Sequence, residues 1–188
     1  NGYAKNQLLT VEDVLPFYRS LSSDMPNVEK GWALSSVFGG NTANSEFEFL
    51  TGHSMAFLPK NTVAYNLYLN KNNSFSIVDA LKKAGYTTVG MHPEAPINWS
   101  RDKIYSYYGF DNILFKDDFT GLTDEDYYRG HVSDSAVFRK IIELYESKDE
   151  NTPLFTFAVT MMNHGGYSTE NFESTVHIKD FPQYTGTQ

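Results

Sequence analysis

The chain of 188 residues contains no cysteine, which excludes disulfide bonds and thiol chemistry. It has no apolar run long enough to cross a bilayer and no secretory signal at its start. Lysine and arginine form no cluster, and with a formal net charge of −8 this argues against nucleic acid as the main partner. The first residues, Asn1-Gly2-Tyr3, lack an initiator methionine, and Thr185-Gly186-Thr187-Gln188 closes no recognisable element. These absences predict a fragment, and they leave both a bacterial surface and the cytoplasm open.

The residues that are present predict a folded α/β domain. The 14 phenylalanines and 13 tyrosines supply a substantial core, and the length suits one domain. The first half predicts helices over 10–22, 43–51 and 74–85, and strands over 32–38 and 86–91. The helix over 43–51 turns Phe47 and Leu50 inward, and serine caps and a terminal glycine bound the helix over 74–85.

The second half continues the alternation. Short elements are predicted over 101–108 (helix) and 113–115 (strand). Ser133 caps a helix that runs to about Lys148. Its predicted buried stripe consists of Val137, Phe138, Ile141, Ile142 and Leu144. Residues 153–161 predict a central parallel strand that is buried on both faces. Helix and strand in alternation indicate a three-layer α/β/α sheet, where ligands bind beyond the carboxyl ends of the strands.

One candidate nucleophile stands where the first predicted strand gives way to a helix. In Gly39-Gly40-Asn41-Thr42 the Thr42 hydroxyl lies near a helix N-terminus, which favours an anion such as a phosphate or sulfate ester. An alcohol at neutral pH needs a base or a metal to react. The alternative is an N-cap threonine that satisfies backbone N–H groups and does nothing else.

Two further loops follow predicted strands and would meet Thr42 at one edge of the sheet. His92-Pro93-Glu94 comes after the second strand and Asn163-His164 after the last. The glycines after His164 permit close approach of a ligand. His92 is interpreted as a structural residue or as one that supports the site residues without touching the substrate. Glu46, Glu48 and the remaining histidines (His53, His131 and His177) are expected to be ordinary surface groups, and the acidic run from Lys116 to Asp126 a solvated loop.

Three ordered motifs resemble the lipoteichoic acid synthase-like phosphoglycerol transferases, in the sulfatase branch of the alkaline phosphatase superfamily. They are Gly39–Phe47 with Leu50-Thr51-Gly52, the Trp99-Ser100-Arg101 element, and Thr160–His164. The resemblance covers nearly the whole chain. It implies an alkaline phosphatase-like α/β/α sandwich, truncated at both ends, with residues 1–188 forming part of one catalytic domain.

The resemblance also implies roles for individual residues. Thr42 would be the nucleophile and a ligand of Mn²⁺ or Mg²⁺. His164 would contact the substrate phosphate or protonate the leaving group, and Trp99 and Arg101 would hold the head group. Glu94 would hydrogen-bond glycerol hydroxyls. The implied reaction moves glycerophosphate from a phospholipid to a glycerol or glycan hydroxyl through a threonine-linked intermediate.

The sequence departs from this family in its metal ligands. The chain contains no Glu-Ser-Phe motif to supply a glutamate ligand. It also contains no downstream Asp-His pair, because Val176 precedes His177 and Phe181 follows Asp180. We expect the remaining ligands to lie outside this chain, and the chain alone to be inactive. The resemblance further implies a parent protein anchored by N-terminal helices at the extracellular face of the cell membrane, with this fragment soluble.

Two alternatives remain open from the sequence. Thr42 could belong to another superfamily enzyme, a sulfatase or a phosphoethanolamine transferase, although the setting Thr42-Ala43-Asn44 does not match the nucleophile segment of sulfatases. Alternatively, the chain could be a non-catalytic surface module that binds glycerophosphate or glycan without turnover.

Overall fold

The computed structural model describes residues 12–21, 24–38, 40–68, 75–165 and 179. The chain divides into two compact units: residues 1–33 with 165–188, and residues 34–164. Each unit is described by itself below.

The described part of the first unit contains one short helix, α2 (Pro16–Ser20). A helix over 10–22 was predicted, and Thr10 lies outside the described residues. Pro16 occupies the first helical position, because its ring and its missing N–H group are tolerated there but not in a helix interior. Asp13 Oδ1 accepts from the backbone N–H of Leu15 and from Nε of Arg19, at 3.0 and 2.8 Å. The expected longer helix is therefore wrong for residues 12–15.

The second unit is built on a parallel three-stranded sheet. Its strands are β1 (Thr87–Met91), β2 (Asn112–Leu114) and β5 (Leu154–Ala158), in the order β2-β1-β5. Thr87 pairs with Leu154 and Val89 with Asn112. The prediction of a central strand over 153–161 is wrong in its position. β1 is the middle strand, and the residues of β5 are all half-buried because no described strand pairs with its other edge.

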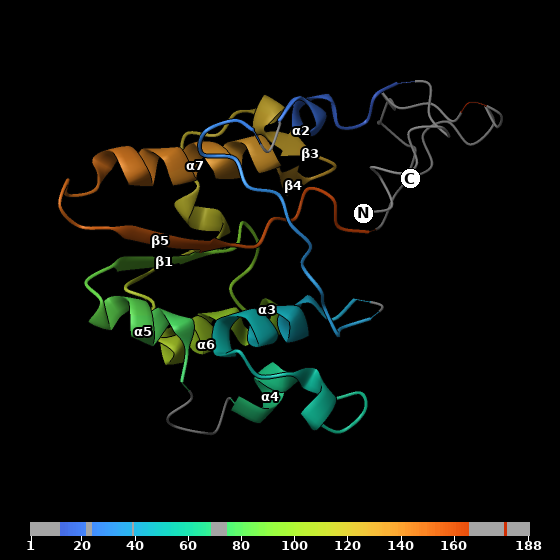
Figure 1. Ribbon diagram of the computed structural model, residues 1–188, viewed down its shortest axis with the longest axis vertical. Coiled ribbons are helices and arrows are strands. Elements are labelled where there is room, and N and C mark those ends of the chain that lie inside the picture. Colours follow the sequence, from blue (N-terminus) through green and yellow to red (C-terminus); the bar gives the residue numbers. More distant parts are fainter. Residues whose placement is uncertain (1–11, 22–23, 39, 69–74, 166–178, 180–188) are drawn as a thin grey trace. The chain divides into compact units, whose positions relative to one another are not determined.

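Helices cover both faces of this sheet, which confirms the α/β prediction (Figure 1). On one side lie α3 (Thr42–Thr51), α5 (Ile77–Lys83) and α6 (Arg101–Tyr108), with α4 (Ala64–Tyr68) against α3. On the other lies α7 (Asp134–Ser147). Two apolar cores result. One joins the first helix set to residues such as Phe110 and Phe157, and the other joins α7 to Val89, Met91 and Val132.

Local capping explains where the well-predicted helices begin. Ser76 Oγ accepts from the backbone N–H of Asp79, and Ser133 Oγ from that of Ala136, at 3.1 and 3.2 Å. Both bonds satisfy N–H groups that the first helical turn leaves without partners. In the predicted stripe of α7, Val137 is buried and Ile141 and Leu144 pack against the core. Phe138 and Ile142, however, are 59% and 54% exposed.

The predicted strand over 32–38 is absent from the structure. In this segment one backbone N–H group bonds to a nearby hydroxyl, and another hydroxyl bonds to a side chain of α3. The backbone N–H of Val37 donates to Ser35 Oγ at 3.2 Å, and Ser36 Oγ donates to Glu48. β-Branched and aromatic residues alone do not make a strand where no described neighbour pairs with it.

The remaining elements are short. A two-stranded antiparallel hairpin joins β3 (Tyr127–Tyr128) to β4 (His131–Val132). Four 3₁₀ turns complete the described chain: Met55–Phe57, Asn98–Ser100, Lys116–Asp118 and Asp124–Asp126. In the expected solvated loop, Asp118 and Asp126 accept from backbone N–H groups of Phe115 and Thr123. Within the described residues, no helix has the length and apolar character needed to cross a membrane.

Candidate active site

Thr42 is the first residue of α3 and is exposed. The chain reaches it through two left-handed residues, Gly40 at φ +97° and Asn41 at φ +57°. Asn41 occupies the cap position, and its carbonyl accepts from the N–H of Asn44 at 2.8 Å, but its side chain makes no capping bond. The N-cap reading of Thr42 therefore does not describe it. The structure presents an exposed hydroxyl at the positive end of a ten-residue helix.

One turn after Thr42, Glu46 forms a buried ion pair with Arg101. The two residues are 3% and 2% exposed, and Arg101 Nη2 lies 2.5 Å from Glu46 Oε1. Arg101 Nε also donates to the carboxylate, at 3.1 Å to Oε2. The hydroxyls of Tyr65 and Tyr105 donate to Oε2 at 2.9 and 3.0 Å. The prediction that Glu46 is a solvated surface charge is wrong, because its partner is 55 residues away in sequence.

The surroundings of this pair raise the pKa of Arg101 and of the two tyrosines. Burial by itself would lower the pKa of Arg101, but the hydrogen bond and charge of Glu46 outweigh it and raise that pKa. Burial, with the Glu46 charge second, raises the pKa of Tyr65, and burial dominates the same rise for Tyr105. Both hydroxyls therefore remain donors, and the carboxylate has its oxygens satisfied without solvent.

Trp99 lies in the turn that leads into α6, immediately before this ion pair. Trp99 and Ser100 both adopt left-handed backbone conformations, with φ values of +57° and +54°. Such conformations are costly for residues other than glycine and occur often at functional sites. Arg101 Nη1 donates to the carbonyl of Asn98 at 3.2 Å and holds the turn closed. As a result Trp99 is 40% exposed while Arg101 is buried.

His92 joins the carboxyl end of β1 to the chain that leaves β5. It is 1% exposed, and its Nδ1 lies 2.9 Å from the carbonyl of Val159. Burial, followed by the charge of Arg101, lowers the pKa of His92. The contact assigns the proton to Nδ1, since a carbonyl only accepts. This agrees with the interpretation of His92 as a structural residue.

Glu94 and His164 belong to a second cluster that also contains His131. Nδ1 of His131 lies 3.4 Å from Glu94 Oε2, and the His131 and His164 rings meet edge to face with centroids 6.1 Å apart. Lys116 Nζ lies 4.0 Å from Glu94 Oε1. His131, expected to be an ordinary surface residue, is instead half-buried between two predicted site residues. No signal in the sequence places His131 beside Glu94 and His164, because the hairpin turn at Arg129 and Gly130, both with positive φ, sets its position.

The contacts thus place the predicted site residues in two groups. Arg101 is paired with Glu46, which lies one turn after Thr42 on α3. Glu94 and His164 form the other with His131. The first turn of α3 lies on the side of the sheet where β1 and β5 end, as expected for the three loops (Figure 1). The roles assigned to Thr42, His164, Trp99, Arg101 and Glu94 remain predictions.

The described residues do not fit a metal site by themselves. Among them no group of three or more histidine, aspartate or glutamate side chains could hold an ion, and Thr42 Oγ1 is the single predicted ligand they supply. One hydroxyl does not complete the coordination of Mg²⁺, which requires six oxygen ligands.

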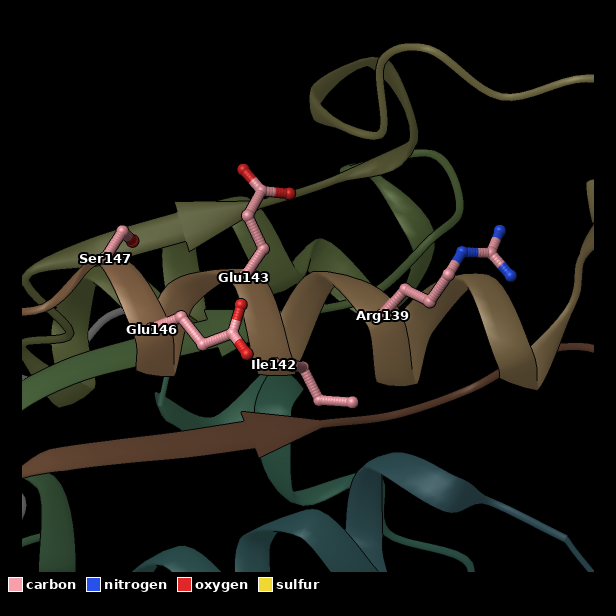
Figure 2. A pocket seen from close by; sticks show the side chains of 5 residues that line it. All are labelled: Arg139, Ile142, Glu143, Glu146 and Ser147. Carbon is pink, nitrogen blue, oxygen red and sulfur yellow. The ribbon is translucent and has the colours of Figure 1, made fainter.

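A depression of about 410 Å³ lies elsewhere, along α7 (Figure 2). Its described lining residues are Arg139, Ile142, Glu143, Glu146 and Ser147, all from this one helix. It shares no residue with either group described above.

Comparison with known families matches residues 10–185 to the model named Sulfatase. The chain is 30% identical over 174 residues to the "Putative cyclic beta-1,2-glucan modification protein" of Rhizobium meliloti. That match covers 90% of this chain and 26% of the relative, so the chain spans about a quarter of the length of that relative.

Solved structures show the same fold. The lipoteichoic acid synthase LtaP from Listeria monocytogenes matches 81% of this chain and 36% of its own, with a TM-score of 0.63 and 20% identity. The phosphoglycerol transferase GacH from Streptococcus pyogenes, in complex with sn-glycerol-1-phosphate, matches 78% of this chain and 38% of its own. Its TM-score is 0.62 at 25% identity. The predicted alkaline phosphatase-like α/β fold is confirmed.

Proposed function

The chain belongs to the sulfatase family, and from that premise we propose that its parent protein is a phosphoglycerol transferase with Thr42 as nucleophile. The observation that carries the proposal is the exposed hydroxyl of Thr42 at the start of α3. A phosphate group beside this terminus would meet backbone N–H groups that have no helical partner. The structural likeness to GacH and LtaP supports a glycerophosphate group as the group that is transferred.

The proposed reaction has two steps. In the first, Thr42 Oγ1, as the alkoxide left after its proton passes to solvent, forms a bond to phosphorus, the bond from phosphorus to the lipid alcohol breaks, and His164 gives a proton to that leaving oxygen. In the second, an acceptor hydroxyl attacks phosphorus, its proton passes to His164, and the bond from phosphorus to Thr42 breaks, which releases Thr42 as the alkoxide. Splitting one transfer into two displacements is the general advantage of a covalent nucleophile.

The donor in this proposal is a phospholipid head group, and the acceptor is a glycerol or glycan hydroxyl. Similarity to a protein named for modification of a cyclic glucan favours the glycan. The exposed face of Trp99 suits a glycerol or sugar ring. Arg101 and Glu94 are proposed to hold the head group. Arg101 is also paired with Glu46, and Glu94 Oε2 lies 3.4 Å from Nδ1 of His131.

Enzymes of this superfamily are generally metal-dependent, and we propose Mn²⁺ or Mg²⁺ as the ion. The ion would lower the pKa of the Thr42 hydroxyl and neutralise charge on the phosphate. We propose that the other ligands come from outside the described residues. The location of the enzyme at the extracellular face of a membrane is likewise part of this proposal.

The test uses the full natural chain that contains these 188 residues, with manganese and a phosphatidylglycerol donor. Wild type is expected to release glycerophosphate and to carry a glycerophosphate mass on the peptide that contains Thr42. Thr42→Ala is expected to lose both, with a rate at least about a thousandfold lower, since removal of a nucleophile eliminates the covalent route. Ser45→Ala, which removes a hydroxyl from the same helix, is the matched control and is expected to retain activity.

Other outcomes assign the other functions. Activity on sulfate esters or on phosphoethanolamine lipids, without release of glycerophosphate, would identify a different enzyme of the superfamily. Binding of glycerophosphate without turnover would identify a surface module. Full activity of Thr42→Ala would contradict the assignment of the nucleophile.

A further inference from the structure

The β3–β4 hairpin contacts the loop that carries His164 through several side chains. Figure 1 shows β3 and β4 beside the start of α7, on the side where β5 ends. Arg129, in the turn of the hairpin, donates from Nη2 to the carbonyls of Met162 and His164 at 2.8 and 3.3 Å. Asn163 Nδ2 donates to Asp134 Oδ2 at 3.4 Å, at the first turn of α7. The hairpin thus binds the carbonyls of Met162 and His164, and α7 binds the side chain of Asn163.

His131 extends this contact to the imidazole itself. Its ring meets that of His164 at an interplanar angle of 63°, with 6.1 Å between centroids. Nδ1 of His131 is buried and has no hydrogen bond of good geometry among the described residues, although Glu94 Oε2 lies only 3.4 Å away. A buried polar atom needs a partner, and Glu94 is at the distance where a small rotation of either side chain would supply one.

We propose that His131 is a positioning residue for His164 and that Glu94 acts through His131, rather than only through contact with a glycerol hydroxyl. The inference rests on the proposed function, in the form in which His164 protonates the leaving oxygen. The carboxylate of Glu94 orients the imidazole of His131, and the edge of His131 fixes the plane of the His164 ring. A carboxylate that orients one histidine is a familiar way to set the geometry of a proton donor.

A comparison of leaving groups tests this role in the full natural chain. The probes are two esters of glycerol phosphate, one with a long-chain alcohol and one with 4-nitrophenol, whose departure needs no proton. His131→Phe keeps the ring and removes its nitrogens. We expect kcat/KM, which reports the steps up to departure of the leaving group, to fall about tenfold for the alkyl ester, a fraction of what general acid catalysis contributes, and to stay within a factor of about two for the nitrophenyl ester.

Glu94→Gln is expected to slow the alkyl ester as His131→Phe does. The double variant should be little slower than His131→Phe alone, because both substitutions remove the same interaction between Glu94 and His131. His53→Phe makes the same substitution at an exposed histidine outside the cluster and is expected to change neither rate. Equal slowing of both esters by His131→Phe would overturn the inference, because damage to the scaffold does not distinguish leaving groups. Fully additive effects of Glu94→Gln and His131→Phe would overturn it too.

A second measurement separates this inference from the proposed function. Diethyl pyrocarbonate modifies exposed imidazoles, and mass spectrometry measures the rate of modification of His164 and of His53 in the same sample. In His131→Ala, His164 is expected to react faster while His53 keeps its rate. If wild type cleaves neither ester but His164 responds, the proposed function fails and the positioning stands. An unchanged His164 rate overturns the inference whatever the activity.

Discussion

The ion pair between Glu46 and Arg101 gives a quantitative prediction for stability. Both side chains are 3% exposed and the carboxylate is fully hydrogen-bonded, so removing one partner leaves a charge buried without its counter-charge. We expect Glu46→Gln or Arg101→Met each to lower the free energy of unfolding by about 3–5 kcal/mol, the usual cost of breaking a buried pair. For a chain of this length, that corresponds to a fall in Tm of about 6–20 °C.

The double variant makes the prediction specific. Glu46→Gln with Arg101→Met removes both charges, so neither is left buried without its counter-charge. The double variant should therefore be at least about 2 kcal/mol more stable than the sum of the two single effects predicts. Urea unfolding followed by far-ultraviolet circular dichroism measures all four proteins.

Asp79→Asn is the matched control for this cycle. Asp79 pairs with Lys83 at 2.6 Å on the exposed surface of α5, and we expect its loss to cost no more than about 0.5 kcal/mol. If Glu46→Gln costs no more than Asp79→Asn, or if the effects of the two buried changes simply add, the reasoning is refuted.

Two further predictions concern the strand β1 and the residue that follows it. Because burial lowers the pKa of His92 in the folded chain, the stability that its neutral form contributes is complete above the unfolded pKa of about 6.5 and is lost as pH falls below it. Tm measured at pH 7.5 and 5.5 should therefore fall more in wild type than in His92→Asn, and an equal or smaller fall would contradict the assignment. A Cβ at Gly90 would lie 3.0 Å from the Tyr105 ring and 3.1 Å from that of Phe110, so Gly90→Ala should cost about 1–3 kcal/mol. Gly31→Ala, where a Cβ meets nothing within 4 Å, should be close to neutral in the same urea titration.

What could be predicted from the sequence is mostly what local chemistry decides. Ser76 and Ser133 cap their helices through bonds to residues three positions later, and a reader of the sequence sees both partners together. The start of the helix that carries Thr42 is predicted within one residue, because the glycines and Asn41 before it mark the break in the chain. Short-range patterns of this kind also led to the correct α/β class.

Other features depend on partners that the sequence does not place side by side. The pairing of Arg101 with Glu46 is not predictable in this way, because the two residues are 55 positions apart. The strand over 32–38 has suitable residues but lacks a described strand to pair with. β5 is apolar enough for the centre of the sheet, yet β1 takes that position. His131 reaches Glu94 only because Arg129 and Gly130 turn the hairpin.

The order of the strands has a consequence for how the chain is made. β1 leaves the ribosome first and pairs with β2 after a short delay, whereas its partners in β5 are 67 residues further along the chain. At ordinary rates of synthesis this delay is about 3–13 s. During it, one edge of a nascent apolar strand has no partner of its own, which is the state in which chains pair wrongly with one another. The free edge of β1 therefore stays exposed until β5 is synthesised and pairs with it.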